Sequence, residues 1–314
     1  MRRPESGLSP RAALVAALLA VPLGACAGAT ATRGPDGATA AGPAVDLDEH
    51  ALFTSDGKPA ALADLLAAVA TVDLVGFGEL HNHAVGSRVE LEVLEGMAAQ
   101  GRPVALAMEF FEADDQAALD RYLAGEIDEA TFRAETRRDA NYASSHRPLI
   151  EFARAHKLPV IAANAPRRLV VAYRKAGGHD YPGYLAGLSP EDRALLPRTS
   201  VPPDDEFKVR FMTLMGPRRG PAFFPSMCLW NDAMAESIAD FRAAHPDHRV
   251  LLIVGAFHVA RHLGVVTRFK ERRAGDTVRV LVMSPAEGAM GFARDDRGEG
   301  DFVLRVRVPP PAKG

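Results

Sequence analysis

Two glycines in this sequence are each followed, three residues later, by a histidine, and each glycine comes directly after an apolar run. The pairs are Gly78 with His81 and Gly255 with His258. Short apolar runs rich in Val, Leu and Ile are typical of buried strands in a parallel sheet. The residues that follow such strands gather at one edge of the sheet, where open α/β folds bind their ligands. We therefore expect both histidines in one crevice.

Two carboxylates are expected at the same edge of the sheet. Glu79 lies between Gly78 and His81, and Glu109 ends a further apolar run at residues 104–108. If the chain stays extended beyond Gly78, the side chains of Glu79, His81 and His83 share one face, because alternate residues of a strand point the same way. An exposed polar turn is the simpler alternative for this stretch.

The set of Glu79, His81, Glu109 and His258 could do two kinds of chemistry. Two imidazoles and two carboxylates can hold a divalent transition ion such as Zn, Mn or Fe, with coordination positions left open. Without a metal, a carboxylate can polarise an imidazole that activates water as a general base. These four residues are thus our candidate metal ligands and our candidate catalytic residues. The alternative is a polar network that only closes the sheet edge.

Other polar residues could lie near this crevice. Arg167 and Arg168 begin a helix, where the helix dipole disfavours positive charge. A negative partner would resolve the conflict, and Glu79, Glu109 or an anionic ligand group such as a carboxylate could supply it; solvated arginines are the alternative. His262 follows His258 by one helical turn and could line the same crevice.

Strands and helices alternate along the chain, which predicts an α/β fold with a parallel β-sheet and helices on both faces. Beyond the run before Gly78, the expected strands are 104–108, 158–163, 250–254 and 278–283, with an edge strand at 301–308. The expected helices are 60–70, 87–99, 114–124, 127–136, 149–156, 167–176 and 224–244. Segments 110–150 and 178–225 interrupt the alternation. We expect them to form a small helical cap subdomain within a single domain of residues 46–308.

The first 45 residues have the composition of a targeting segment and a tether. Arginines open the chain and an apolar run follows, so residues 1–25 read as a signal peptide. The sequence before Cys26 resembles a bacterial lipobox, which predicts acylation of that cysteine; an ordinary secretory signal is the alternative. Residues 26–45 would be a flexible tether and 309–314 a disordered tail. By resemblance to Gram-negative lipoproteins, Ala27 after the cysteine favours the outer membrane over the inner membrane of the cell envelope.

Charge and cysteine content narrow the function classes. The formal net charge is -3 and no dense stripe of Lys or Arg occurs, which argues against nucleic acid as a partner. If Cys26 is acylated, Cys228 has no partner for an intrachain disulfide. Its apolar neighbours indicate a buried structural thiol.

The chain resembles the ChaN family of haem-binding lipoproteins, within the superfamily that also holds Tiki-type proteases and erythromycin esterases. The resemblance covers roughly residues 50 to 285. It rests on the ordered motifs Gly78-Glu79-Leu80-His81, Met108-Glu109-Phe110, Leu119-Asp120-Arg121-Tyr122-Leu123-Ala124-Gly125, Arg147-Pro148-Leu149, Asn164-Ala165-Pro166-Arg167-Arg168, Leu229-Trp230-Asn231-Asp232-Ala233-Met234-Ala235 and Gly255-Ala256-Phe257-His258.

This resemblance implies a parallel α/β domain with a small helical subdomain, a lipid anchor in the outer membrane and a role in haem or iron uptake. It also implies that Glu79, His81, Glu109 and His258 correspond to the metal or catalytic site of the esterase and Tiki relatives. A hydrolase that uses the same crevice is the first alternative function. A non-catalytic interaction protein on this scaffold is the second.

The resemblance leaves the haem contacts open. Many relatives have several Trp and Tyr residues in the stretch that here runs from Asp139 to Pro148, whereas this chain keeps Tyr142 and has His146 before Arg147. Haem iron accepts either Tyr or His as a ligand. The expected haem-contact residues are Tyr142, His146, Arg167 and Arg168. The expected partners are haem or another small molecule and the outer membrane, and a homodimer is one assembly we consider.

Overall fold

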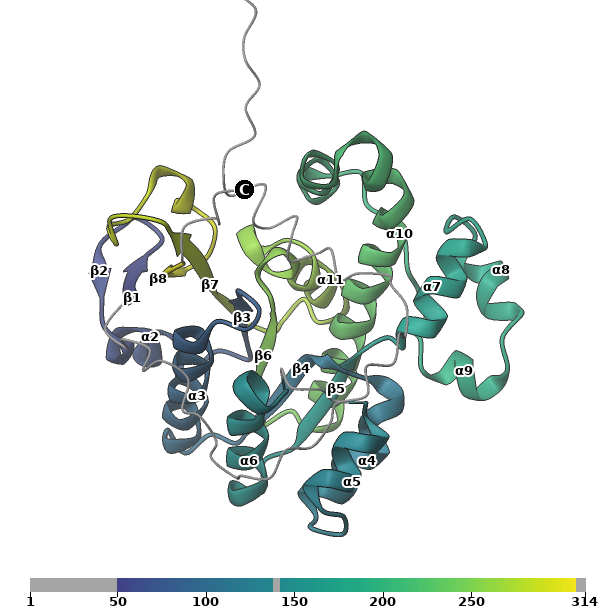
Figure 1. Ribbon diagram of the computed structural model, residues 1–314, viewed down its shortest axis with the longest axis horizontal. Coiled ribbons are helices and arrows are strands. Elements are labelled where there is room, and N and C mark those ends of the chain that lie inside the picture. Colours follow the sequence, from purple (N-terminus) through teal and green to yellow (C-terminus); the bar gives the residue numbers. More distant parts are fainter. Residues whose placement is uncertain (1–49, 138–141, 309–314) are drawn as a thin grey trace, which may run out of the picture.

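The computed structural model describes residues 50–137 and 142–308. The expected signal peptide, the acylation site Cys26, the tether and the tail lie outside the described residues. The described chain forms an eight-stranded sheet in the order β2-β1-β8-β7-β3-β6-β4-β5 (Figure 1). The strands are β1 His50–Thr54, β2 Pro59–Ala60, β3 Leu74–Glu79, β4 Val104–Glu112, β5 Val160–Asn164, β6 Arg249–Gly255, β7 Val278–Ala286 and β8 Phe302–Arg307.

The strands from β8 to β5 are parallel to one another, whereas β1 and β2 are antiparallel. The expected α/β fold with a parallel sheet is therefore confirmed. The expectation that residues 301–308 form an edge strand is wrong, because β8 lies between β7 and β1. Strand β1, which covers β8 by antiparallel pairing from His50 to Thr54, was not among the expected strands. An interior position explains why five of the six residues of β8 are buried.

Helices cover both faces of the sheet (Figure 1). They are α2 Leu62–Val69, α3 Ala84–Ala99, α4 Gln116–Leu123, α5 Glu129–Glu135, α6 Arg147–His156, α7 Arg167–Lys175, α8 Tyr181–Ala186, α9 Pro190–Ala194, α10 Glu206–Ala244 and α11 Val265–Arg272. A short π-helix, Tyr142–His146, precedes α6. None of the helices in the described part of the chain is both long and apolar enough to span a bilayer.

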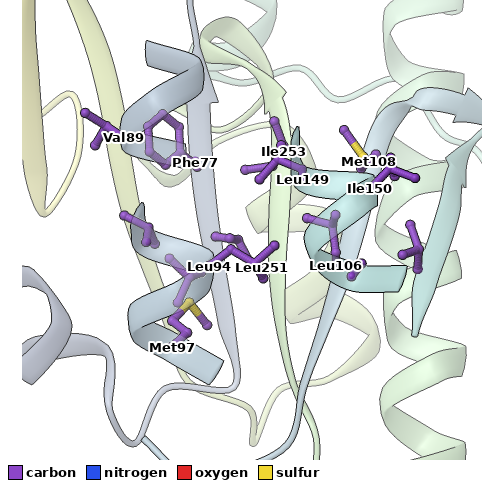
Figure 2. Close-up of a cluster of buried hydrophobic side chains, with 14 of the residues drawn as sticks. Phe77, Val89, Leu94, Met97, Leu106, Met108, Leu149, Ile150, Leu251 and Ile253 are labelled. Carbon is purple, nitrogen blue, oxygen red and sulfur yellow. The ribbon is translucent and has the colours of Figure 1, made fainter. Parts of the chain in front are cut away.

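The alternation of buried strand residues divides the core into two layers. Phe77, Met108 and Ile253 point to the face covered by α3 and α6, where they pack with side chains such as Leu94 and Leu149 (Figure 2). The residues between them in each strand point to the opposite face, against α10 and α11. Because successive strand side chains alternate in this way, the face of each residue at a strand end is set by the same register.

The two segments expected to form a helical cap pack at different places. Helices α4 and α5 join the core on the α3 and α6 face through Leu119 and Phe132. Helix α8 packs through Tyr181 on α7 and on Leu229 of α10. Helix α10 starts at Glu206, well before the expected start at residue 224, and contains a break at Gly216 (φ 73°, ψ 173°).

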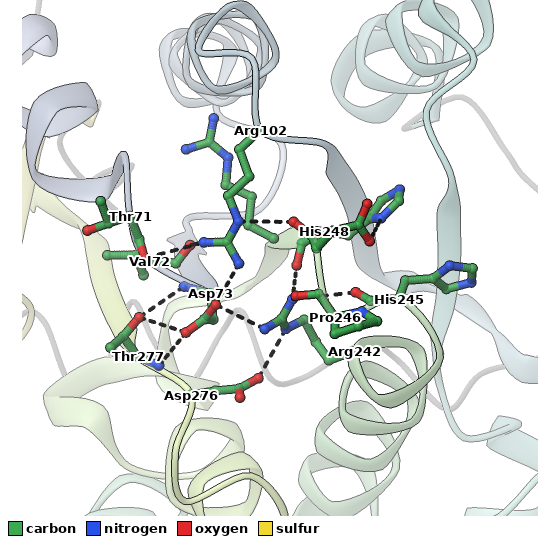
Figure 3. Close-up of polar contacts among 12 residues, drawn as sticks. Thr71, Val72, Asp73, Arg102, Arg242, His245, Pro246, His248, Asp276 and Thr277 are labelled. Carbon is green, nitrogen blue, oxygen red and sulfur yellow. Dashed lines mark hydrogen bonds and ion pairs between the residues drawn. The ribbon is translucent and has the colours of Figure 1, made fainter.

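The end of the sheet opposite the candidate site is closed by a network of ion pairs (Figure 3). Asp73 lies just before β3 and accepts hydrogen bonds from Arg102 Nη2 at 2.6 Å and from Arg242 Nη2 at 2.9 Å. It also accepts the backbone N–H of Thr277 at 2.8 Å. These bonds join the segments that lead into β3, β4 and β7 to the end of α10. They hold in register the strands that carry the site at their other ends.

Candidate functional site

The first half of the site is a carboxylate–imidazole pair at the end of β3. Glu79 is the last residue of β3, and its Oε1 lies 2.7 Å from Nδ1 of His81. Glu79 is buried, whereas the side chain of His81 keeps 26% of its surface exposed. Burial by itself would lower the pKa of His81, but the carboxylates of Glu79 and Glu109 outweigh it and raise the pKa. The Nδ1–H therefore points to Glu79, and Nε2 is the ring nitrogen left for a ligand.

His83 does not join this pair, because the chain does not stay extended as far as His83. The chain turns at His81, and Asn82 has a φ of 59°, a left-handed conformation that Asn tolerates better than most residues. His83 then caps α3, where its Nδ1 accepts the N–H of Gly86 at 3.3 Å. Its Nε2 lies 2.9 Å from the backbone oxygen of Arg307. His83 thus has a structural role.

The second half of the site joins β4, β6 and α10. Glu109 Oε2 accepts the backbone N–H of Gly255 at 2.7 Å, and Glu109 Oε1 lies 3.5 Å from Nε2 of His258. The other ring nitrogen of His258, Nδ1, lies 2.5 Å from Oδ1 of Asn231. An amide oxygen only accepts, so Nδ1 carries the proton and Nε2 faces the carboxylate. Complete burial lowers the pKa of His258, so its ring is neutral at pH 7.

The two halves belong to opposite faces of the sheet and meet at its edge. Glu79 follows Phe77 by two residues and shares its face with α3 and α6. Glu109 lies toward the face of α10 and α11, because it faces His258, whose ring is bound to Asn231 of α10. Strand β6 lies between β3 and β4, so the two carboxylates are separated by the end of β6. The structure brings the predicted residues Glu79, His81, Glu109 and His258 together as two linked pairs.

Two further polar residues lie against Glu79. Glu90 of α3 is 1% exposed, and burial together with the neighbouring Glu79 raises its pKa well above its usual range. The raised pKa favours the protonated carboxyl of Glu90, which can donate to the carboxylate of Glu79. His146, at the end of the π-helix, places Nε2 3.5 Å from Glu79 Oε2. Burial favours the neutral form of Glu79. The hydrogen bonds and charges of two imidazoles, with His146 contributing more than His81, have the larger combined effect and lower the pKa of Glu79.

Phe110 connects these imidazoles. Its ring stacks on His146 with centroids 3.9 Å apart, and it meets His81 edge-on at 5.5 Å. Strand β4 loses its regular pairing with β5 between Met108 and Glu112. A bulge of this kind re-aims side chains next to functional sites. Phe110 is partly exposed and therefore forms an aromatic wall beside His81.

The sequence analysis did not predict Glu90, Phe110 and Asn231 as site residues. Glu90 could have been found, because it lies four residues before Leu94 and interrupts the apolar face of an amphipathic helix. Phe110 and Asn231 belong to the motifs that carried the family resemblance. No periodicity in the sequence predicts that Asn231, which lies on α10, forms a hydrogen bond with His258.

The other predicted site residues lie apart from the crevice or within the core. Tyr142 is 2% exposed, packs edge-on to Phe132, and its hydroxyl has no hydrogen-bond partner among the described residues. Arg168 pairs with Asp192 at 2.7 Å and lies 3.5 Å from Asp114, so its negative partners are these two carboxylates and neither Glu79 nor Glu109. Arg167 is exposed. His262 does not enter the crevice, because its Nε2 lies 2.8 Å from Oδ2 of Asp301.

The expected divalent metal centre is not found in the described part of the chain, where no three His, Cys, Asp or Glu side chains are arranged to hold an ion. The reason lies in the directions of the four predicted ligands. Each imidazole has Nδ1 bound to the protein and keeps Nε2 for a ligand, but Nε2 of His258 faces Glu109 inside the protein. Glu79 and Glu109 also point to opposite faces, so the four side chains do not converge on one point.

Solved structures with a similar fold come from several classes of protein. ChaN of Campylobacter jejuni, whose structure shows cofacial haem binding, aligns over 82% of this chain and 96% of its own with a TM-score of 0.59 and 14% identity. A Bacillus cereus protein aligns over 79% and 92% (TM-score 0.45, 11% identity). The erythromycin esterase EreC aligns over 74% and 77% (TM-score 0.46, 11% identity). The first of these similarities supports the fold, and the other two are too distant to carry an argument.

Sequence comparison is more specific than these structural similarities. None of the curated proteins matches the chain. The family model described as haem-binding uptake, Tiki superfamily, ChaN matches residues 65–269, which is more than half of the sequence and contains every residue of both half-sites. The chain therefore belongs to the ChaN family of haem-binding uptake proteins, in the Tiki superfamily.

Proposed function

We propose that this protein binds haem at the crevice beside His81 and takes part in haem or iron uptake. The observation that carries the proposal is the geometry of one imidazole. His81 is partly exposed, its Nδ1 is held by a buried carboxylate at 2.7 Å, and no described residue hydrogen-bonds its Nε2. A histidine oriented in this way through its second nitrogen is the usual form of an imidazole that ligates a metal.

The residues around His81 fit a haem group better than a bare ion. Haem iron needs one axial ligand from the protein, and His is among those it accepts, whereas a bare divalent ion needs three or four side chains. Phe110 offers an aromatic surface beside His81. Bound haem would supply an iron centre with an open coordination position; the protein supplies the imidazole and the carboxylate that orients it.

Tyr142 and His146, the ligands expected from the sequence, are placed differently. Both are buried, and Nε2 of His146 faces Glu79 from inside the protein. In this arrangement His146 supports the pair of Glu79 and His81 from behind, and Tyr142 packs in the aromatic core. We therefore assign the iron ligand to His81.

A haem titration tests the proposal. Added to the purified full chain, hemin is expected to give a Soret band shifted from that of free hemin and to saturate at a fixed stoichiometry. The His81→Ala variant is expected to lose the shift. His156 is a matched control, because its ring lies on Phe152 of α6, away from the crevice. An unshifted Soret band with the wild-type chain would refute the proposal.

We further propose that acylated Cys26 anchors the protein in the outer membrane. The support is the sequence before this cysteine and the short apolar run that precedes it. Metabolic labelling with a fatty acid in a bacterial host tests this: the wild-type chain is expected to incorporate label and to sediment with outer membranes, and Cys26→Ala is expected to do neither. Labelling of the alanine variant would contradict the assignment.

A hydrolase is the second candidate, and one observation favours it. His258 is neutral, and Asn231 fixes its tautomer so that the unprotonated Nε2 faces Glu109. A neutral imidazole beside a carboxylate can take a proton from water. Screening of the wild-type chain and His258→Ala against ester and peptide substrates tests this candidate. Turnover that is absent in the variant supports it, and equal turnover in both excludes His258 as the base.

A further inference from the structure

Gly255 occupies the place where the two half-sites meet. It is the last residue of β6, the strand that separates β3 from β4. Its N–H holds Glu109 Oε2 at 2.7 Å. A Cβ atom at this position would lie 3.0 Å from Cε1 and 3.2 Å from Nε2 of His81, and 3.5 Å from Glu109 Oε2. The ring of His81, which comes from the end of β3, therefore lies directly over the Cα of Gly255.

The backbone does not require glycine at this position. Gly255 has φ -55° and ψ 135°, a conformation that any residue adopts. Its amide also makes a hydrogen bond that any residue except proline could make. The need for glycine is steric. Carbon atoms pack best at about 3.5 to 4.0 Å, and a methyl group on residue 255 would therefore push the imidazole of His81 away by several tenths of an ångström.

The imidazole has little freedom to yield. Its Nδ1 is tied to Glu79 at 2.7 Å, and its edge contacts the ring of Phe110. If the ring were displaced, either its hydrogen bond to Glu79 would lengthen or its contact with Phe110 would be lost. The same movement would take the ring away from the end of β6, where Glu109 is bound.

We propose that Gly255 is a positioning residue: its bare Cα lets the His81 ring lie over the end of β6, where Glu109 is bound, and this joins the half-sites on the two faces of the sheet into one site. The inference concerns the site of the proposed function, but it holds whichever ligand that site takes. A ligand on Nε2 of His81 then lies beside the carboxylate that faces His258. If the wild-type chain does not bind haem, the proposed function is refuted, but this inference still stands.

A double-mutant cycle on thermal unfolding of the full chain tests the steric part. Gly255→Ala is expected to lower the melting temperature by a few degrees in the wild-type background, because the new methyl group meets His81. The same substitution in the His81→Ala background is expected to have almost no effect. Gly275→Ala is the control, since a Cβ at that turn has open space, and it should behave alike in both backgrounds. Equal destabilisation by Gly255→Ala in both backgrounds would overturn the proposal.

An NMR experiment on the ligand-free chain tests the joining of the halves. At one fixed pH, Glu109→Gln is expected to shift the ring Hε1 signal of His81, which the His81→Ala variant identifies. In the Gly255→Ala background the same substitution is expected to shift this signal by less than half as much. The Gly275→Ala background should preserve the full shift. A full shift with alanine at position 255 would show that His81 and Glu109 are joined without the bare Cα.

Discussion

Glu79 and His81 are only two residues apart, yet their side chains meet at 2.7 Å because the chain turns between β3 and α3. An extended chain would have pointed both side chains the same way without a direct bond. The turn gives the buried carboxylate one exposed partner, and it leaves a single imidazole nitrogen free to face the crevice. The pair therefore works as a unit, and its properties can be tested one residue at a time.

We expect Glu79→Gln to lower the pKa of His81. Glu79 is one of the two carboxylates that raise this pKa against the opposing effect of burial, and glutamine keeps the shape without the charge. The pKa can be measured by following the His81 ring proton signals from pH 5 to pH 9. His156→Ala, outside the crevice, should leave the pKa of His81 unchanged. An unchanged or raised pKa in Glu79→Gln would contradict the assigned hydrogen bond.

Asn231 is expected to fix the tautomer of His258. The Asn231→Ala variant removes the acceptor of the Nδ1–H, so ¹⁵N chemical shifts of the His258 ring should change from one tautomer to a mixture. Asn231→Asp restores an acceptor and adds a negative charge, so it should keep the tautomer and raise the pKa of His258. If the ring nitrogens of His258 have the same shifts in wild type and Asn231→Ala, the hydrogen bond does not set the tautomer.

The hydrogen bonds of Asp73 predict how the free energy of unfolding changes at acidic pH. Burial raises the pKa of Asp73, but hydrogen bonds from Arg102 and Thr277 outweigh it, and the pKa in the folded protein lies below the ordinary value. Asp73 therefore binds a proton more readily in the unfolded chain than in the folded protein. Its carboxylate contributes its full stabilisation above about pH 4. Its contribution is lost as the pH falls through the folded-state pKa.

We therefore expect Asp73→Asn to reduce the free energy of unfolding by about 2 kcal/mol at pH 7, the range of charge-assisted hydrogen bonds. The difference from wild type should shrink below about pH 4, where the unfolded-state group is protonated. Urea unfolding at pH 7 and pH 3 measures both values. Asp56→Asn serves as a control, because the partners of Asp56 among the described residues are its neighbours Thr54 and Lys58 at the surface. If Asp73→Asn lowers the free energy of unfolding by the same amount at both pH values, the ion-pair network is contradicted.

The sequence predicted the parallel sheet and the meeting of four site residues because both depend on local patterns. Apolar runs mark the strands, and parallel strands bring their carboxyl ends to one edge. The pairing within the site depends on tertiary contacts that no local pattern shows. Asn231 reaches His258 across 27 positions, and the bare Cα of Gly255 matters because of a ring that comes from another strand.

Two differences from the sequence patterns have identifiable physical reasons. His83 would have shared the face of Glu79 and His81 only if the chain had stayed extended past the end of β3, where Asn82 turns it. Residues 301–308 were assigned to an edge because their alternation is typical of edge strands, whereas β1, a short strand at the start of the described chain, covers them. Both differences arise at strand ends and sheet borders, where a residue outside the periodic segment decides the outcome.

The central claim is that His81, and not Tyr142, is the side chain that meets the haem iron. Electron paramagnetic resonance of the ferric haem complex tests it with two variants. Tyr142→Phe removes a buried hydroxyl that has no partner among the described residues, so we expect an unchanged spectrum and unchanged stability. His81→Ala is expected to abolish the wild-type signal, and added imidazole should partly restore it. The claim is contradicted if Tyr142→Phe changes the spectrum and His81→Ala leaves it as in the wild type.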